Sequence, residues 1–215
     1  MSTDVLKRIT ETGVVAIIRG TNPDSVIETI DALKRGGVSV VEVTANTDGV
    51  LRMLRDVRSS FTSNEVVVGA GTVLDSETAR TTMLAGAEFL VTPSFDEGTI
   101  RAANRYGVPS IVGISTATEA VDAYETGADM VKVFPASTLG PQFVSALQGP
   151  LGFIPMVPTG GMTLDDVNAF VDAGATAIGV GSSIIDTKAV ETTDYEILTS
   201  NARQFIQAVD AARDS

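Results

Sequence analysis

The chain has 215 residues, of which 44% are hydrophobic, and it carries a net charge of −12 with no His and no Cys. This length suits one sizeable core, so we expect a single domain over residues 1–215. The missing Cys excludes disulfides and thiolate metal sites, and the missing His removes the commonest general base. The acidic balance argues against nucleic-acid binding, because a negative surface repels phosphate backbones.

The N-terminal segment is charged and lacks a continuous apolar core, and no apolar run is long enough to cross a bilayer. We therefore expect a cytoplasmic protein without a membrane partner. Lysine is scarce, since only Lys7, Lys34, Lys132 and Lys188 occur. An acidic, lysine-poor chain suits a high-salt cytoplasm, where salt screens self-repulsion, and the alternative is an ordinary acidic bacterial enzyme.

Short apolar runs rich in Val and Ile alternate with amphipathic stretches along the whole chain. The runs are nearly continuous rather than alternating, which is typical of parallel strands buried on both faces. After an N-terminal helix over Asp4–Thr12, the runs predict eight strands, over Val14–Arg19, Val38–Thr44, Val66–Ala70, Glu88–Thr92, Pro109–Gly113, Met130–Phe134, Ile154–Thr159 and Ala177–Val180.

Helical patterns lie between these strands, and several of them end at a glycine, which is a common stop for a helix. The predicted helices are Pro23–Arg35, Asp75–Ala85, Phe95–Tyr106, Thr116–Thr126 and Thr163–Ala173, with a last helical region over Asp186–Arg213. This order predicts an α/β fold, a (β/α)₈ TIM barrel whose N-terminal helix covers the barrel bottom. A doubly wound open sheet is the alternative, but no Gly-x-Gly-x-x-Gly follows the first strand to support a dinucleotide site.

Lys132 lies near the end of an otherwise apolar strand, in the segment DMVKVFP of residues 129–135. Such a lysine can simply extend its ammonium group into solvent. A buried strand is nevertheless a costly place for a charge, and desolvation lowers a lysine pKa and leaves more free amine to attack a carbonyl. Because barrel active sites lie at strand ends, Lys132 is the first candidate for a Schiff-base nucleophile.

Glu42 is a carboxylate inside the second predicted strand, in the segment VVEVT of residues 40–44. It could be a buried ion-pair partner for Lys132 or Arg19. A buried Glu should also have a raised pKa, which suits proton transfer at neutral pH. With no His in the chain, Glu42 is the best candidate for the general acid/base.

Glycine-rich segments close three of the predicted strands: GAGT at residues 69–72, PTGG at residues 158–161 and GVGSS at residues 179–183. Glycines can merely end strands. Loops after the seventh and eighth strands of a barrel, however, commonly hold phosphate through backbone N–H groups, and glycine lets the backbone approach the anion closely.

Taken together and in this order, these segments resemble the 2-keto-3-deoxy-6-phosphogluconate (KDPG) and 4-hydroxy-2-oxoglutarate (KHG) aldolase family over nearly the whole chain. The matching segments include GGV and VEVT within residues 36–44, VGAGTV at 68–73, Thr92-Pro93, GIST at 113–116, VKVFPA at 131–136, PTGG at 158–161 and GVGS at 179–182. The resemblance implies a class I aldolase that needs no metal or other cofactor. It also implies a homotrimer whose partners are pyruvate and a phosphorylated aldehyde.

The resemblance implies a role for each matching residue. Lys132 would form the imine with pyruvate, and Glu42 would move protons. Thr72 and its turn, with Gly71, would hold the pyruvate carboxylate, while Pro93 and Phe134 would form the pocket wall. The phosphate or distal end of the substrate would lie against Thr159, Gly160, Gly161, Gly181 and Ser182.

Three positions depart from the family pattern. The family usually has an Arg four residues after the Glu, where it pairs with the substrate carboxylate, but this chain has Asn46. Asn offers a hydrogen bond without a charge, so Arg19, at the end of the first strand, is expected to supply the cation, unless it partners Glu42. Ser94 and Ser137 stand where many relatives have Gly and Glu.

The predicted reaction is cleavage of 2-dehydro-3-deoxy-6-phosphogluconate to pyruvate and glyceraldehyde 3-phosphate. The galactonate epimer, 4-hydroxy-2-oxoglutarate and a non-phosphorylated sugar acid are alternative substrates. Two alternatives lie outside aldolases. One is a phosphate-binding barrel isomerase or epimerase with Glu42 as base. The other is a sugar-acid-phosphate binder that has lost catalysis through the change at Asn46.

Overall fold

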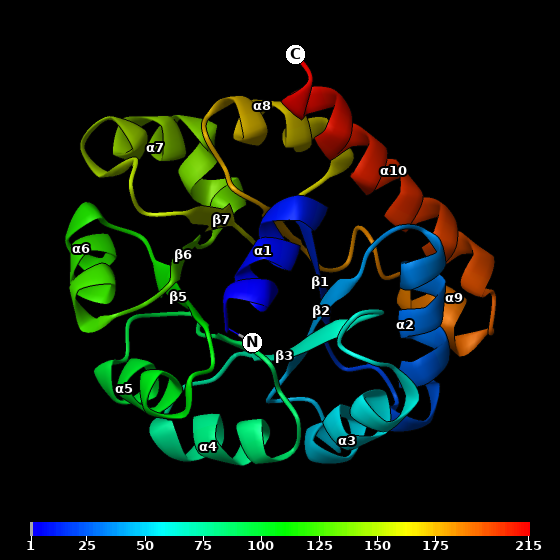
Figure 1. Ribbon diagram of the computed structural model, residues 1–215. Helices are drawn as coiled ribbons and strands as arrows, with labels where there is room; N and C mark the ends of the chain where they lie inside the picture. The colour runs from blue at the N-terminus through cyan, green and yellow to red at the C-terminus, as the bar shows by residue number, and fades with distance from the viewer. Residues whose placement is uncertain (1) are drawn as a thin grey trace.

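Eight parallel strands form the inner wall of the protein in a computed structural model that describes residues 2–215 (Figure 1). Their order in the sheet is β7-β6-β5-β4-β3-β2-β1-β8. A bridge between Thr159 and Gly179, and a 2.9 Å hydrogen bond from Thr176 N–H to Met156 O, join β7 to β8 and close the ring. The strands are β1 (Val14–Ile18), β2 (Val40–Thr44), β3 (Val67–Gly71), β4 (Leu90–Val91), β5 (Ser110–Ile114), β6 (Met130–Val133), β7 (Met156–Pro158) and β8 (Ile178–Val180).

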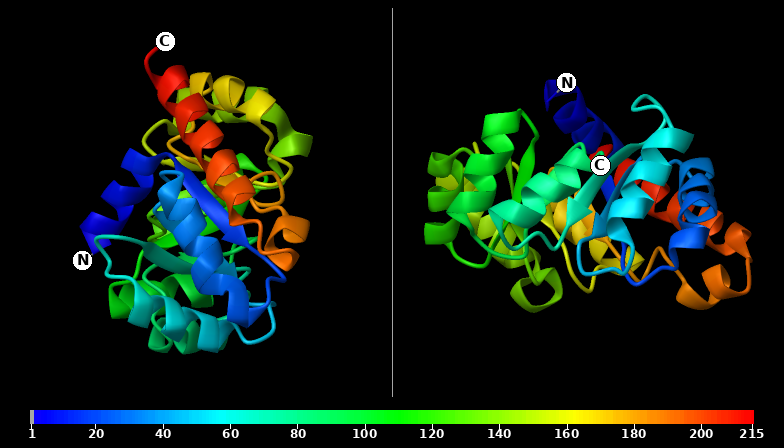
Figure 2. Two further views of the ribbon diagram at one scale, coloured as in Figure 1. Left: turned by 90° about the vertical axis from the view of Figure 1, so that its right-hand side faces the viewer. Right: turned by 90° about the horizontal axis from the view of Figure 1, so that it is seen from below.

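An outer ring of helices surrounds the strands, which confirms the predicted (β/α)₈ barrel (Figures 1 and 2). Two short 3₁₀ turns, η1 (Pro23–Ser25) and η2 (Leu164–Asp166), precede α2 and α8. The surrounding helices are α2 (Val26–Arg35), α3 (Val50–Ser60), α4 (Ser76–Leu84), α5 (Glu97–Tyr106), α6 (Ala117–Thr126), α7 (Ala136–Leu151), α8 (Val167–Asp172) and α10 (Tyr195–Arg213). Within residues 2–215, none of the helices is both long and apolar enough to cross a membrane.

Helix α1 (Ser2–Thr12) crosses the centre of the ring in Figure 1 and closes the end of the barrel at which the strands begin. Its Val5 and Ile9 side chains pack against the strand residues Val15 and Met130 and against Phe89, which directly precedes β4. The predicted bottom-covering helix is therefore confirmed. These contacts make the floor of the barrel apolar, and the buried ionisable side chains of Glu42 and Lys132 lie farther along their strands.

Three helical features differ from the sequence-based expectation. Helices α3 and α7 were not predicted, because neither carries a strong local start signal. Helix α3 begins after a left-handed Gly49 with no side-chain cap, and α7 contains Pro141 and a non-helical Gly140 with φ 74°. The last helical region is also split into α9 (Thr187–Glu191) and α10, because Thr193 has a left-handed φ of 57° that ends a helix.

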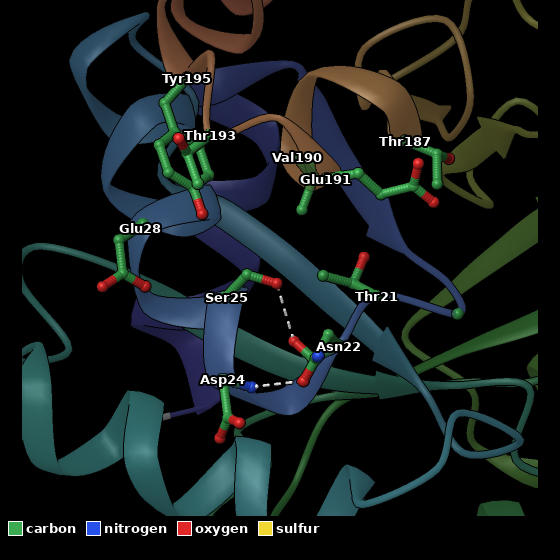
Figure 3. Close-up of a pocket in the computed structure, with 11 residues that line it drawn as sticks. Thr21, Asn22, Asp24, Ser25, Glu28, Thr187, Val190, Glu191, Thr193 and Tyr195 are labelled. Carbon is green, nitrogen blue, oxygen red and sulfur yellow. Dashed lines mark hydrogen bonds between the residues drawn. The ribbon is translucent and has the colours of Figure 1, made fainter.

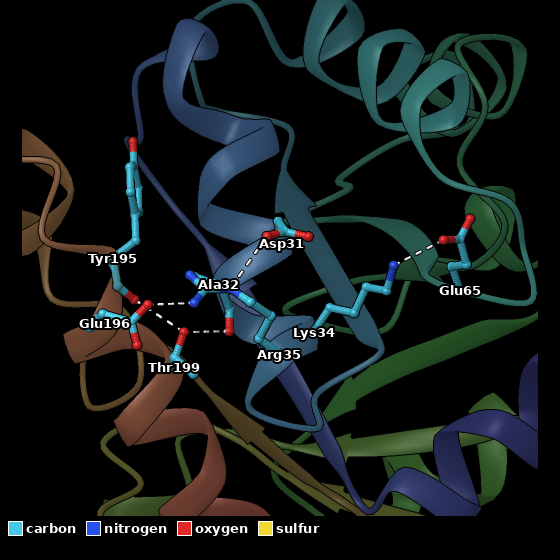
Figure 4. A network of polar contacts seen from close by, with 8 residues as sticks. All are labelled: Asp31, Ala32, Lys34, Arg35, Glu65, Tyr195, Glu196 and Thr199. Carbon is cyan, nitrogen blue, oxygen red and sulfur yellow. Dashed lines mark hydrogen bonds and ion pairs between the residues drawn. The ribbon is translucent and has the colours of Figure 1, made fainter.

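Helix α10 completes the outer ring by packing against α2, as Figure 4 shows. Arg35 of α2 forms an ion pair with Glu196, and the Thr199 hydroxyl donates a 3.0 Å hydrogen bond to the carbonyl of Ala32. At the end of α2, a Cβ on Gly36 would overlap the side chain of Ala202 and lie 2.6 Å from the carbonyl oxygen of Thr199. Glycine at this position therefore permits the two helices to approach this closely.

Candidate active site

Lys132 lies in the middle of β6 with its side chain directed into the barrel, and it is only 4% exposed. Burial lowers its pKa, the nearby charge of Arg19 lowers it further, and the charge of Glu42 partly opposes both effects. The ammonium nitrogen lies 5.0 Å from the centre of the Phe134 ring. Burial therefore favours the neutral amine, which is the form that attacks a carbonyl.

Glu42 occupies the central inward position of β2 and is 2% exposed. Burial raises the pKa of its carboxyl group, against the lowering effect of the charges on Lys132 and Arg19. Among the described residues, its Oε1 atom has no hydrogen-bond partner. A Cβ on Gly71 would lie 2.5 Å from that Oε1, so a larger residue there would displace the carboxyl group from this place.

Glu42 and Lys132 meet in one small cavity on the barrel axis, which Thr159 of the β7–β8 seam also lines. The rest of the cavity wall is apolar and includes Val91 and Ile111. Burial thus shifts both the amine and the carboxyl group of this cavity toward their neutral forms. A nucleophile beside a proton donor and acceptor is the equipment required for imine chemistry on a keto acid.

Arg19 reaches across the rim of the barrel instead of forming an ion pair with Glu42. Its guanidinium donates to the Asn46 side-chain oxygen at 3.3 Å and to the Thr72 hydroxyl at 3.1 Å. Thr72 adopts a left-handed φ of 55°, which is unusual for a β-branched residue. Residues from the ends of β1, β2 and β3 are therefore brought together around one fixed cation.

The remaining predicted site residues surround the open end of the barrel. Phe134 follows β6, and its ring lies 3.0 Å from where a Cβ on Gly160 would be. A Cβ on Gly161 would approach Ser137 Oγ to 2.6 Å, and both glycines have positive φ. Gly181 opens the turn after β8 by accepting bonds from the N–H groups of residues 184 and 185, and Ser182 is exposed beside it.

Pro93 lies at the rim, where its backbone packs against that of Gly113. A Cβ on Gly113 would overlap the Pro93 carbonyl, so the turn after β4 packs directly on β5. The Thr92 hydroxyl donates to Ser94 O at 2.7 Å and accepts from Gly113 N–H at 3.0 Å, which fixes this turn. All of the predicted site residues thus lie in the barrel interior or at its C-terminal rim.

Two larger cavities lie elsewhere, and none of the predicted site residues lines either of them. One of about 640 Å³ lies between the β1–α2 loop and helices α9 and α10, where Asp24, Glu28 and Glu191 make its wall acidic (Figure 3). The other, of about 680 Å³, lies at the barrel bottom beside α1. Neither of these cavities is lined by a buried amine and a buried carboxyl group, whereas the small cavity on the barrel axis has both.

Sequence reasoning missed two buried threonines beside the Arg19 cluster. Thr44 and Thr47 lie at and just after the end of β2, and their hydroxyl oxygens are 2.9 Å apart. A polar residue at an inward position of a buried strand was the available signal, and Thr44 has that position two residues after Glu42. Within residues 2–215 there is no group of three or more Asp or Glu residues placed to hold a metal ion.

A family model described as KDPG and KHG aldolase matches residues 5–200 of the chain. The chain belongs to this aldolase family. The 2-dehydro-3-deoxy-6-phosphogalactonate aldolase of Escherichia coli strain K12 is 33% identical over 81% of this chain and 85% of its own length. The 2-dehydro-3-deoxy-phosphogluconate aldolase of Treponema pallidum strain Nichols is 32% identical over 91% of this chain and 93% of its own.

A solved structure described as native KDPGal is similar throughout, with a TM-score of 0.88 and 31% sequence identity over 94% of this chain and 96% of that one. The predicted family membership is thus confirmed, and the protein is an enzyme of the lyase class. Family membership favours the aldolase prediction over both the isomerase and the non-catalytic binder.

Proposed function

We propose that this KDPG/KHG-family aldolase cleaves 2-dehydro-3-deoxy-6-phosphogluconate to pyruvate and glyceraldehyde 3-phosphate through a Schiff base on Lys132. The observation that supports this most is the placement of a buried lysine and a buried carboxyl group in one cavity of the barrel. Both groups are held toward their neutral forms by burial. That state lets the amine attack a ketone while the acid supplies a proton.

In the proposed reaction, the Lys132 amine attacks the C2 carbonyl of the substrate, and the carbinolamine formed loses its hydroxyl group as water. Glu42 gives the proton that this hydroxyl needs in order to leave. The protonated imine then accepts the electron pair of the C3–C4 bond, while the C4 hydroxyl returns its proton to Glu42 through water. The aldehyde leaves, the enamine takes a proton at C3, and water releases pyruvate from Lys132.

The rim residues provide the binding groups of this proposal. Arg19 and the Thr72 hydroxyl bind the substrate carboxylate, so that Arg19 takes the part of the family arginine that Asn46 replaces. Phe134 and Pro93 wall the pocket. The distal phosphate lies on Thr159 and on the turns after β7 and β8, which contribute Gly160, Gly161, Gly181 and Ser182.

Trapping with borohydride tests the proposal directly. Pyruvate plus borohydride should add one reduced imine to the chain, and peptide mass mapping should place it on Lys132 among the four lysines. Lys132→Ala should abolish both the adduct and cleavage, while Lys34→Ala, which removes a lysine paired with Glu65 outside the candidate site, should leave both unchanged. An adduct on another lysine, or cleavage without any adduct, would disprove the mechanism.

A second candidate substrate is 2-dehydro-3-deoxy-6-phosphogalactonate, because the E. coli relative that is 33% identical carries that name. Release of pyruvate from a panel that contains both C4 epimers, 4-hydroxy-2-oxoglutarate and a non-phosphorylated sugar acid distinguishes the candidates. We expect the gluconate compound to have the highest kcat/KM. A preference for the galactonate epimer would reassign the substrate but not the reaction.

We also propose that the enzyme is a cytoplasmic homotrimer, which follows from the family resemblance. The exposed apolar side chain of Leu74, which lies near the rim, supplies surface for contact with a second copy. Light scattering should then give three times the 22.3 kDa mass of one chain. A monomer mass at micromolar concentration would contradict this part of the proposal.

A further inference from the structure

A pair of buried threonine hydroxyls joins the end of β1 to the end of β2. Thr44 is fully buried and Thr47 is 5% exposed. Their Oγ1 atoms are 2.9 Å apart, and Thr47 Oγ1 also accepts a 3.1 Å hydrogen bond from the backbone N–H of Gly20. The backbone N–H of Thr47 donates to the carbonyl of Thr44 at 2.9 Å, so residues 44–47 form a tight turn.

These hydrogen bonds join residues that are next in sequence to Arg19 and Asn46. Gly20 directly follows Arg19, and Thr47 directly follows Asn46. The hydrogen bond from Gly20 to Thr47 therefore fixes the distance between the backbones of the two residues whose side chains meet at 3.3 Å. Gly20 has a left-handed φ of 65°, which glycine adopts readily, and its bond to Thr47 holds the chain in that conformation as it leaves β1.

We propose that Thr47, supported by Thr44, is a positioning residue that sets the Arg19 guanidinium against Thr72 before a keto-acid carboxylate arrives. Thr47 itself touches no substrate. An arginine on a free loop loses rotamer freedom when it binds an anion, whereas one held in place beforehand has already lost it. This inference rests on the role proposed above for Arg19, and it adds that affinity for the carboxylate depends on a hydroxyl outside the pocket.

Thr47→Val tests the inference, because valine keeps the shape of threonine and removes the acceptor for the Gly20 N–H. The KM for the keto acid, and the pyruvate concentration that gives half-maximal trapping, should rise about five- to tenfold, as the loss of one hydrogen bond of ordinary strength predicts. The kcat should stay within about twofold. Thr47→Ser, which keeps the hydroxyl, should restore the KM.

Thr199→Val is the matched control, since it removes another buried hydroxyl bonded to a backbone group, but in α10 away from the rim. It should lower the melting temperature and leave the KM unchanged. If Thr47→Val does not fold, Thr44→Val provides the same test in milder form, because it removes only the supporting hydroxyl. Its expected rise in KM is smaller, about two- to threefold.

A double-mutant cycle of Arg19 and Thr47 shows whether Thr47 affects the KM by positioning Arg19 or by weakening the site in general. In an Arg19→Ala enzyme, Thr47→Val should raise the KM no further, because there is no guanidinium left to place. A full additional rise in that background, an equal rise in Thr199→Val, or no rescue by Thr47→Ser would each overturn the inference. If the unaltered enzyme traps pyruvate on Lys132 but Thr47→Val keeps a normal KM, only this inference fails. If the unaltered enzyme traps nothing, the proposed function fails with it.

Discussion

At the residue scale, Lys132 and Glu42 show which properties of a site the sequence pattern can predict and which it cannot. Both were recognisable as charged residues inside buried strands, and the structure places them in one cavity. The pKa of each group depends on the charge of the other and on that of Arg19, and these distances cannot be read from the sequence pattern. Strands β2 and β6 are far apart in sequence, so only the closed ring makes these charges neighbours.

The lowered pKa of Lys132 predicts the pH dependence of imine formation. Only the neutral amine attacks, so the rate should rise with pH and reach half its maximum below the value of about 10.4 that is ordinary for lysine. In Glu42→Gln the half-maximum should move lower still, because the carboxylate charge that raises the Lys132 pKa is gone, while the maximum rate falls with the loss of the proton donor. Borohydride trapping at a series of pH values measures both. A half-maximum at or above the ordinary value would show that burial does not control this lysine.

If Arg19 takes the part of the family arginine at position 46, then an arginine at that position should restore substrate binding to an enzyme without Arg19. Arg19→Ala should raise the KM for the keto acid by about tenfold or more, as expected for losing a charge-assisted hydrogen bond. Adding Asn46→Arg to that variant should recover part of the loss, because it returns a cation to the position where the family usually has it. Steady-state kinetics of the single and double variants measure this. A double variant no better than Arg19→Ala would mean that the two positions do not serve the same carboxylate.

At the element scale, the packing of α10 on α2 was not visible in the sequence. Glycines at helix ends were read as stop signals, and Gly36 does follow the last residue of α2. Its backbone has φ −80°, which any residue can adopt. The need for glycine comes from α10, whose Thr199 and Ala202 leave no space for a Cβ. The reason for this glycine is therefore a contact between segments at opposite ends of the chain.

Gly36→Ala should lower the free energy of unfolding by about 1–3 kcal/mol, the usual cost of forcing an extra methyl group into a packed contact. Gly98→Ala is the control, since Gly98 lies in the first turn of α5 and the nearest atom to its added Cβ is 3.4 Å away. That change should be neutral or should stabilise by up to about 1 kcal/mol, because alanine favours helix. Urea unfolding measures both. Equal effects at the two positions would mean that the close packing of α2 and α10 is not what constrains Gly36.

At the scale of the whole molecule, the charge balance of 27 acidic to 15 basic residues predicts a response to salt. Salt weakens exposed ion pairs such as Lys34–Glu65, but it also screens the net repulsion of −12, which we expect to be the larger effect. The urea midpoint should therefore rise as KCl increases from about 0.1 M to molar concentration. A midpoint that does not change, or that falls, would favour an ordinary acidic enzyme over one adapted to high salt.

The sequence by itself determined the eight strands, most of the helices between them, the barrel, the family and the identity of the two buried ionisable residues. These features are predictable because hydrophobic periodicity and helix stop signals depend on residues that are close together in the sequence. Only the tertiary structure showed that Arg19 donates hydrogen bonds to Asn46 and Thr72 and forms no ion pair with Glu42. It also showed that Thr47, with Thr44, links the ends of β1 and β2, and that the packing of α10 leaves no space for a side chain at Gly36. These are distances between side chains from different strands and helices, and the closure of the ring sets them.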